Sequence, residues 1–169
     1  MRLSTRGRYA VMALVELAVR MRDPEEGDGS VASSAKLARR TEVAGGRPVS
    51  LGEIAQAQLL SVAYLEQLFA RLRRAGLVAS ARGPGGGYRL AKPAEAISIG
   101  AIIEAVDEPI VATRCGEGTP GCLAGERCLT HDLWDELGAQ ISLFLCHISL
   151  ADVVEGRVCG RALPPRTLP

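Results

Sequence analysis

The chain has 169 residues, which is long enough for one ordinary domain with an appendage and a buried core. Its net charge is +1. Residues 1–22 and 61–92 carry net charges of +4 and +5 while the remainder sums to −8, and such a basic face favours a polyanion partner over a uniformly solvated surface. The most apolar run, residues 141–146, is far shorter than the ~20 residues of a membrane span, and no signal-peptide pattern follows the first arginines, so we expect a cytoplasmic protein without a membrane partner.

The first half of the chain predicts a helix, an insert and a helix-turn-helix. The first helix runs from an N-cap at Ser4 to about Arg22, and the Gly- and Ser-rich residues 23–49 predict a flexible surface insert. Ser50 and Glu53 fit a capping box at the start of a short helix. After a brief turn, Ser61 caps a second helix that ends before a left-handed glycine at residue 76. Two short helices with a tight turn between them predict a helix-turn-helix over residues 51–75.

The second of these helices separates into an apolar face and a polar face. The predicted buried stripe consists of Leu65, Leu68, Phe69, Leu72 and Ala75. The opposite face carries polar and cationic side chains, namely Tyr64, Gln67, Arg71 and Arg74, with Ser61, Ala63 and Glu66 near the first turn. This pattern suits a helix in the major groove of DNA, although an ordinary amphipathic surface helix would also satisfy it.

A glycine-rich hairpin follows, with strand candidates at residues 77–82 and 88–90. Pro84 followed by Gly85 is typical of a type II turn, and the absence of a following Lys-Ser/Thr pair excludes a P-loop. A basic hairpin after a recognition helix predicts a wing over residues 77–91, from which Arg82 can enter a minor groove. Ser98 then caps a short apolar helix that ends at Val106.

Residues 107–131 form the segment in which the chain gathers soft metal ligands. Three of the five cysteines and one of the two histidines lie there: Cys115, Cys122, Cys128 and His131. Thiolate and imidazole together favour zinc or an iron–sulfur cluster. The spacing favours the cluster, because structural zinc sites usually contain a close Cys-x₂₋₄-Cys pair, but zinc remains the alternative. Of the other cysteines, Cys146 is expected to be a core thiol and Cys159 an exposed one.

The last predicted helix, in residues 132–155, is apolar on more than one side. Its stripe consists of Trp134, Leu137, Ile141, Phe144, Leu145 and Ile148, and Leu133, Leu143 and Cys146 widen it. A helix that must bury two sides predicts a symmetric homodimer, with burial in a larger monomeric core as the alternative. Residues 156–169 are expected to form a flexible tail.

Several long motifs in this sequence resemble those of the bacterial Rrf-type winged-helix regulators. They are residues 1–11, 64–69, 76–78, 82–88 and 112–115, and residues 128–134 resemble one iron–sulfur-dependent member of that family. The resemblance implies a mainly α fold with a small β-hairpin wing, in which a winged helix-turn-helix domain (residues 1–106) is followed by a cluster-binding loop (107–131) and a long C-terminal dimerisation helix. It does not imply an enzyme.

The resemblance also implies a function and a set of site residues. The protein would be a homodimeric transcription factor that binds double-stranded DNA at promoter operators. It would receive a 2Fe–2S cluster from the iron–sulfur assembly machinery, hold it through Cys115, Cys122, Cys128 and His131, and repress the assembly genes in the holo form. The implied DNA contacts are Ser61, Tyr64 and Gln67 at base edges, Arg82 with Gly83 in the minor groove, Glu66 as the residue that separates two classes of promoter, and Arg2 near phosphate.

Three other functions compete with this interpretation. A 4Fe–4S regulator of the same family that responds to nitric oxide or iron would draw a carboxylate ligand from the N-terminal region, but no Asp or Glu precedes Glu16. A constitutive repressor with structural zinc remains open. An electron carrier or redox enzyme is disfavoured, because no nucleotide-binding glycine pattern or Ser/His/Asp set is present. Two departures from the family pattern are the six residues between Cys115 and Cys122, one more than expected, and Ala63 where serine is common.

Overall fold

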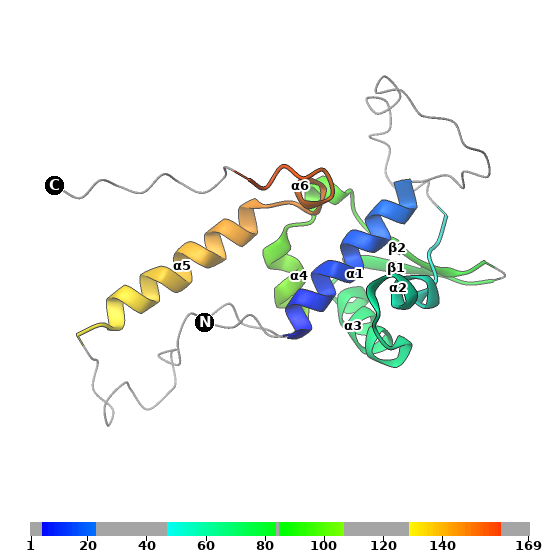
Figure 1. Ribbon diagram of the computed structural model, residues 1–169, viewed down its shortest axis with the longest axis horizontal. Helices are drawn as coiled ribbons and strands as arrows, with labels where there is room; N and C mark the ends of the chain where they lie inside the picture. The colour runs from blue at the N-terminus through cyan, green and yellow to red at the C-terminus, as the bar shows by residue number, and fades with distance from the viewer. Residues whose placement is uncertain (1–4, 23–46, 84, 107–128, 160–169) are drawn as a thin grey trace, which may run out of the picture.

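The computed structural model describes residues 5–22, 47–83, 85–106 and 129–159. The elements in these ranges are α1 (Thr5–Arg22), α2 (Leu51–Gln58), α3 (Val62–Arg74), β1 (Val78–Ala81), β2 (Gly87–Leu90), the 3₁₀ helix η2 (Ala94–Ala96), α4 (Ile99–Ala105), α5 (His131–His147) and α6 (Leu150–Val154). Helix α1 crosses the middle of the body and contacts α2, α3, α4, α6 and β2 (Figure 1). The mainly α fold with a small β-hairpin is confirmed.

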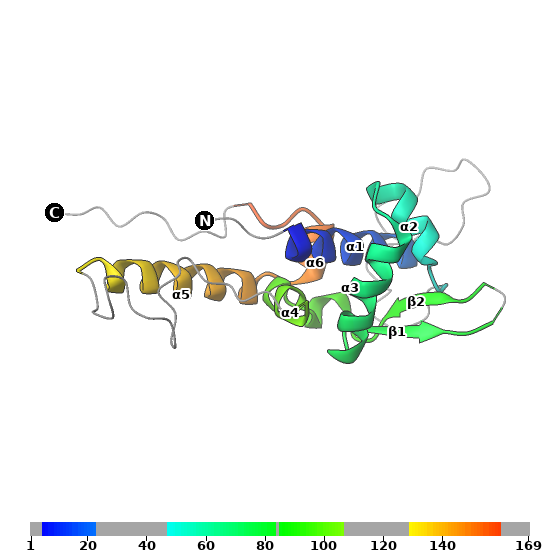
Figure 2. The same cartoon turned by 90° about the horizontal axis from the view of Figure 1, so that it is seen from below.

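The helix-turn-helix and the hairpin lie at one end of the molecule, and α5 projects from the other end (Figures 1 and 2). Helix α5 packs mainly against α4. Strands β1 and β2 pair antiparallel, with Val78 opposite Leu90 and Ala81 opposite Gly87. The two ends of the molecule therefore carry different surfaces, a hairpin-flanked helix on one side and a projecting helix on the other.

The core joins α1 to the helix-turn-helix. Helix α1 contributes Ala10, Ala13, Leu14 and Leu17, and α3 contributes Leu65, Leu68, Phe69 and Leu72, all of them buried. The Phe69 ring meets the Tyr88 ring of β2 edge-on, with centroids 4.8 Å apart. Because each large side chain of this kind stabilises the fold by about 1.5–3 kcal/mol, this cluster fixes α3 against both α1 and the hairpin. Ala75, predicted to extend the buried stripe, is exposed, because it lies at the C-cap beyond the last helical turn.

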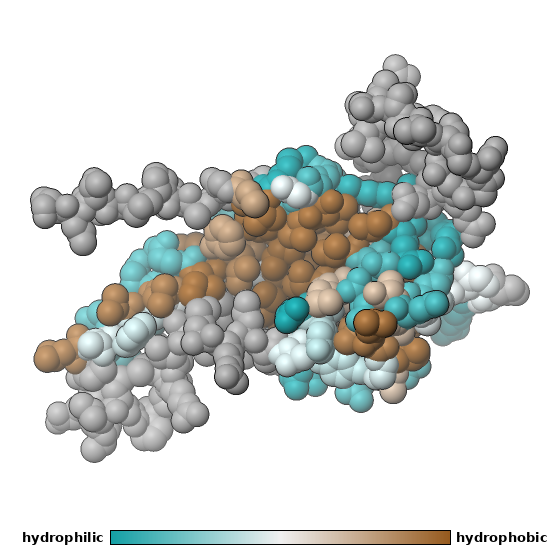
Figure 3. Space-filling view, viewed as in Figure 1, coloured by the Kyte–Doolittle hydropathy of each residue, from teal (hydrophilic) through white to brown (hydrophobic). Residues whose placement is uncertain are grey.

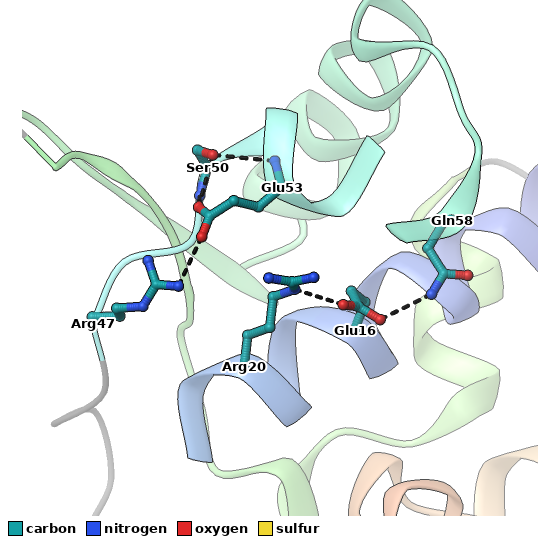
Figure 4. Close-up of polar contacts among 6 residues, drawn as sticks. All are labelled: Glu16, Arg20, Arg47, Ser50, Glu53 and Gln58. Atoms are coloured by element: carbon teal, nitrogen blue, oxygen red, sulfur yellow. Dashed lines mark hydrogen bonds and ion pairs between the residues drawn. The ribbon is translucent and has the colours of Figure 1, made fainter. Parts of the chain in front are cut away.

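The predicted capping residues begin the helices as expected. Ser50 Oγ accepts from the Glu53 N–H at 3.2 Å while Glu53 Oε2 accepts from the Ser50 N–H at 2.8 Å, which completes the capping box of α2 (Figure 4). Glu53 also accepts from Arg47 at 2.7 Å, and these contacts, the Ser50 N–H first, lower the pKa of Glu53 from 4.5 to about 2. Serines at 61, 98 and 149 cap α3, α4 and α6.

Two regions of the body differ from the sequence prediction. Val49, expected inside the surface insert, is fully buried and pairs with Tyr88 as a β-bridge, with Val49 N to Tyr88 O at 2.9 Å. Ile148, expected on the dimer stripe, is only 3% exposed, and its carbonyl accepts from the Ile99 N–H at 2.8 Å. It therefore packs in the core of its own chain, where it fixes the C-terminal end of α5 to the start of α4.

Other expectations fall outside the described residues or find a different environment. The N-cap at Ser4, the insert through residue 46 and the tail from residue 160 lie outside the described ranges. Cys146, predicted to be a core thiol, is exposed, although its Sγ lies close to α4, only 2.6 Å from where a Cβ on Gly100 would stand. Cys159 is exposed, as expected.

Candidate functional site

Most of the residues of α3 that the sequence analysis predicts to contact DNA are exposed. Ser61, Glu66 and Gln67 are exposed in its first two turns. Ser61 Oγ accepts from the Tyr64 N–H at 3.2 Å, so the capping hydroxyl still has its own hydrogen to donate outward. The far end of the helix carries Arg73 and Arg74, both exposed. The outer face of α3 therefore combines polar groups near its N-terminus with positive charge near its C-terminus.

Tyr64 differs from its neighbours because it is half-buried. Its ring meets the Tyr9 ring of α1 edge-on, with centroids 6.0 Å apart and planes 86° apart. Arg71, one helical repeat further along, is also half-buried, and its Nη1 lies 3.4 Å from the Val106 carbonyl at the end of α4. One edge of α3 thus faces the body of the protein, and the sequence pattern did not separate this edge from the exposed residues of the helix.

The hairpin presents Arg82 at the end of its first strand. Arg82 and Gly83 are exposed, and Gly83 has a φ of +110°. The turn closes through the Gly86 N–H, which donates to Gly83 O at 2.8 Å, and Gly85 has the positive φ (+76°) that the third residue of a type II turn requires. The hairpin that carries Arg82 lies at the same end of the molecule as α3 (Figure 2).

The wing is held to the helix-turn-helix by a close backbone contact. A Cβ on Gly87 would lie 2.3 Å from the Val49 carbonyl oxygen, so only glycine permits the bridge between β2 and the segment that leads into α2. The sequence contained a signal for this contact. Val49 precedes the N-cap Ser50 and Ile54 follows at the fourth helical position, which is the pattern of a hydrophobic staple, and both are fully buried.

Only one of the four candidate metal ligands lies in the described ranges. His131 is the first residue of α5 and is half-buried. Cys115, Cys122 and Cys128 lie outside the described residues, as does Arg2. Within the described ranges no group of three or more His, Cys, Asp or Glu side chains could hold a metal.

Helix α5 contains no buried residue over its 17 residues. Its large apolar side chains are exposed by 38–62%: Leu133, Trp134, Leu137, Leu143 and Phe144. Ile141 and Leu145 are half-buried, and Leu145 packs against the core. Apolar residues follow α5 from its free end to the body of the molecule (Figure 3). A continuous apolar strip of this kind on an exposed helix is typical of an interaction surface.

The helix-turn-helix, the exposed polar face of α3 and the adjoining hairpin define a protein of the winged-helix class. The family model of the Rrf2 proteins, described as iron-dependent transcriptional regulators, matches residues 41–156, and the chain belongs to this family. The resemblance seen in the sequence motifs is thereby confirmed.

Individual relatives are similar over most of the chain. The HTH-type transcriptional regulator IscR of Yersinia enterocolitica is 47% identical over 157 residues, which cover 93% of this chain and 81% of that protein. The solved structure of T. potens IscR has a TM-score of 0.64 and 32% identity, covering 98% of this chain and 94% of that one. CymR (YrzC), the global cysteine regulator of B. subtilis, has a TM-score of 0.66 and 32% identity, covering 92% and 98%.

Two further findings bear on the class of function. The family description and the printed names of IscR and CymR are those of regulators and not of enzymes. Among the described helices, none is long and apolar enough to cross a membrane.

Proposed function

We propose that this protein is a homodimeric, DNA-binding transcription regulator whose choice of promoters depends on a bound 2Fe–2S cluster, and that the holo form represses iron–sulfur assembly genes. The proposal rests chiefly on one juxtaposition. His131 begins the projecting helix α5, only three residues after Cys128, in a chain whose opposite end is a winged helix-turn-helix. In the sequence, this candidate ligand set lies between the winged helix-turn-helix and the helix that we propose to pair in the dimer.

The exposed residues of α3 and the hairpin support the DNA-binding part of the proposal. Ser61 and Gln67 would meet base edges together with the outer part of Tyr64, and Glu66 would discriminate between operators. Arg82 would enter the adjacent minor groove beside Gly83, where the negative potential attracts a guanidinium. Arg2 is proposed as a phosphate contact. The net charge of +5 over residues 61–92 would supply the nonspecific attraction to DNA.

The chemistry of the donor set fits an iron–sulfur cluster. Three thiolates and one imidazole, from Cys115, Cys122, Cys128 and His131, would hold it. A histidine ligand can be protonated away more readily than a thiolate, so the cluster would supply a labile centre, as a sensor requires and a structural site does not. We also propose that the assembly machinery donates the cluster, since the regulated genes would then report on its capacity.

The exposed strip of α5 supports the homodimer. Trp134, Leu137, Ile141, Phe144 and Leu145 would pack against the same residues of a second copy, as a two-fold axis requires. Ile148 is left out of this interface because its side chain is already buried within its own chain.

The cluster is tested by purifying the full-length protein without oxygen and recording its absorption and EPR spectra. We expect a coloured protein with 2Fe–2S signals. The two histidines provide a matched pair, because His147 is exposed, lies at the other end of α5, and contacts the Leu143 carbonyl at 2.7 Å. His131→Ala should lose the cluster within minutes of exposure to air, whereas His147→Ala should behave as the wild type. A colourless protein that contains zinc would reject the sensing proposal and leave the constitutive repressor.

DNA binding is tested by titrating an operator duplex and a scrambled duplex at several salt concentrations. Gln67→Ala should reduce the discrimination between the two duplexes by about tenfold, the value of one good base contact. Arg74→Met should weaken both complexes by a similar factor and make the salt slope shallower by about one unit. Equal affinity of the holo and apo proteins for every operator would contradict the proposed role of the cluster.

A further inference from the structure

Two arginines from different helices converge on one carbonyl at the end of α4. Nη1 of Arg6, on α1, and Nη1 of Arg71, on the recognition helix α3, each lie 3.4 Å from the carbonyl oxygen of Val106. Val106 is the C-cap of α4 and is fully buried. It is also the last described residue before the segment that contains the three cysteines.

Electrostatics explains why both cations gather there. The C-terminus of a helix carries partial negative charge and carbonyls without helical partners, which a nearby cation stabilises. The last turn of α4 contains no basic residue of its own, so the positive charge is supplied by α1 and α3. Both long hydrogen bonds are charge-assisted, and because the acceptor is buried they are poorly screened by solvent.

Arg71 differs from the other arginines in the last turn of α3. Arg73 and Arg74 are exposed, whereas Arg71 is half-buried and directed at α4. One helical repeat before it, Tyr64 lies on the same edge of the helix and contacts Tyr9 of α1. The orientation of α3 is therefore held along this edge by an aromatic contact near its start and by the Arg71 contact near its end.

We propose that Arg71 is a positioning residue, which couples the point where α4 ends to the orientation of the recognition helix. This inference rests on the proposed function, because it assumes that the ligand-bearing segment after Val106 differs between the holo and apo proteins. A shift of the chain at Val106 moves the acceptor that Arg71 holds, and α3 follows because Arg71 belongs to it. Arg6 anchors the same carbonyl to α1 and limits how far it moves.

The test compares Arg71→Met with Arg74→Met in the full-length protein. Both substitutions remove one positive charge from the same turn of α3, but Arg71 donates to the Val106 carbonyl whereas Arg74 donates to Ala70 O within its own helix. The first readout is the ratio of apo to holo Kd for operators of both promoter classes, measured by fluorescence anisotropy. We expect Arg71→Met to reduce this ratio by about threefold or more, the usual size of a coupling effect. Arg74→Met should weaken both forms equally and leave the ratio unchanged.

The second readout does not depend on the cluster. Hydrogen exchange of the apo protein should be faster in Arg71→Met at the amides of residues 105 and 106 and at the end of α3, and unchanged there in Arg74→Met. Arg71→Lys, which keeps the charge but not the planar guanidinium, should restore the exchange rates only in part.

The outcomes separate this inference from the proposed function. If the wild type discriminates between holo and apo forms and Arg71→Met does so to the same extent, the inference is wrong and the proposed function stands. If the two arginine variants change hydrogen exchange alike, the specific contact with α4 is refuted. A wild type with no difference between its forms overturns both, because nothing then exists for Arg71 to couple.

Discussion

The capping box of α2 provides a quantitative prediction, because its carboxylate has a pKa far from its ordinary value. Glu53→Gln removes the charge while keeping the shape of the side chain. The pKa of Glu53 is lowered from 4.5 to about 2, first by the Ser50 N–H, then by the Ser50 hydroxyl, and also by Arg47. A shift of this size corresponds to an upper limit of about 3 kcal/mol. The side chain is 30% exposed, so screening reduces the expected contribution to about 1 kcal/mol.

The sign of the pH dependence follows from the lowered pKa. The stabilisation is fully present above pH 4.5 and is lost as the pH falls toward 2, because the folded protein then binds the proton that the unfolded chain bound first. At pH 7 we expect Glu53→Gln to lower Tm by about 2–4 °C. The difference in unfolding free energy between wild type and variant should shrink steadily below pH 4.5.

Urea unfolding of the apo protein at fixed protein concentration, from pH 7 to pH 3, measures this difference. Glu104→Gln, which alters an exposed carboxylate on α4, is the control and should shift stability by less than about 0.5 kcal/mol at every pH. A wild-type advantage over Glu53→Gln that stays constant down to pH 3 would show that the box acts by shape alone and that the charge of Glu53 contributes nothing.

Three other substitutions follow from the backbone and from the exposed strip. Gly87→Ala should lower the free energy of unfolding in urea by about 1–3 kcal/mol, because the new Cβ would lie 2.3 Å from the Val49 carbonyl oxygen. Gly52→Ala, whose Cβ would have enough room on α2, is the control and should not destabilise the protein. Leu59→Gly should raise Tm, because Leu59 is 91% exposed and has a φ of +53°, a conformation that costs a non-glycine residue about 1 kcal/mol. Phe144→Glu should yield a monomer by light scattering, and a dimer that survived would refute the proposed interface.

The features that the sequence predicted well are those encoded by neighbouring residues. The capping serines, the left-handed Gly76 after α3 and the turn with a positive φ at Gly85 all depend on a few residues of local chain. The apolar stripe from Leu65 to Leu72 also emerged, because helical periodicity alone determines which face is buried. These signals were sufficient for the fold class and for the order of the elements.

The features that the sequence did not predict depend on contacts between distant segments. Arg71 has the helical phase of a groove-facing residue, and only the position of α4 shows that it turns inward. Ile148 continues the heptad-like stripe of α5, yet the chain leaves the helix there and joins the core. Cys146 is apolar by type, but among the described residues it lies on a helix that contacts the body mainly through α4.

Because α5 is attached to α4 near its C-terminal end, a small tilt there displaces its N-terminal end by a larger distance. The helix is held where Cys146 packs against Gly100 of α4, and His131 lies at its other end, about 22 Å away at the helical rise of 1.5 Å per residue. A tilt of α5 by about 5° at the Gly100 contact would move His131 by roughly 2 Å, which is the length of a metal–ligand bond. In the proposed homodimer the second protomer would hold α5 in place, so dilution that separates the protomers should also weaken the binding of the proposed cluster.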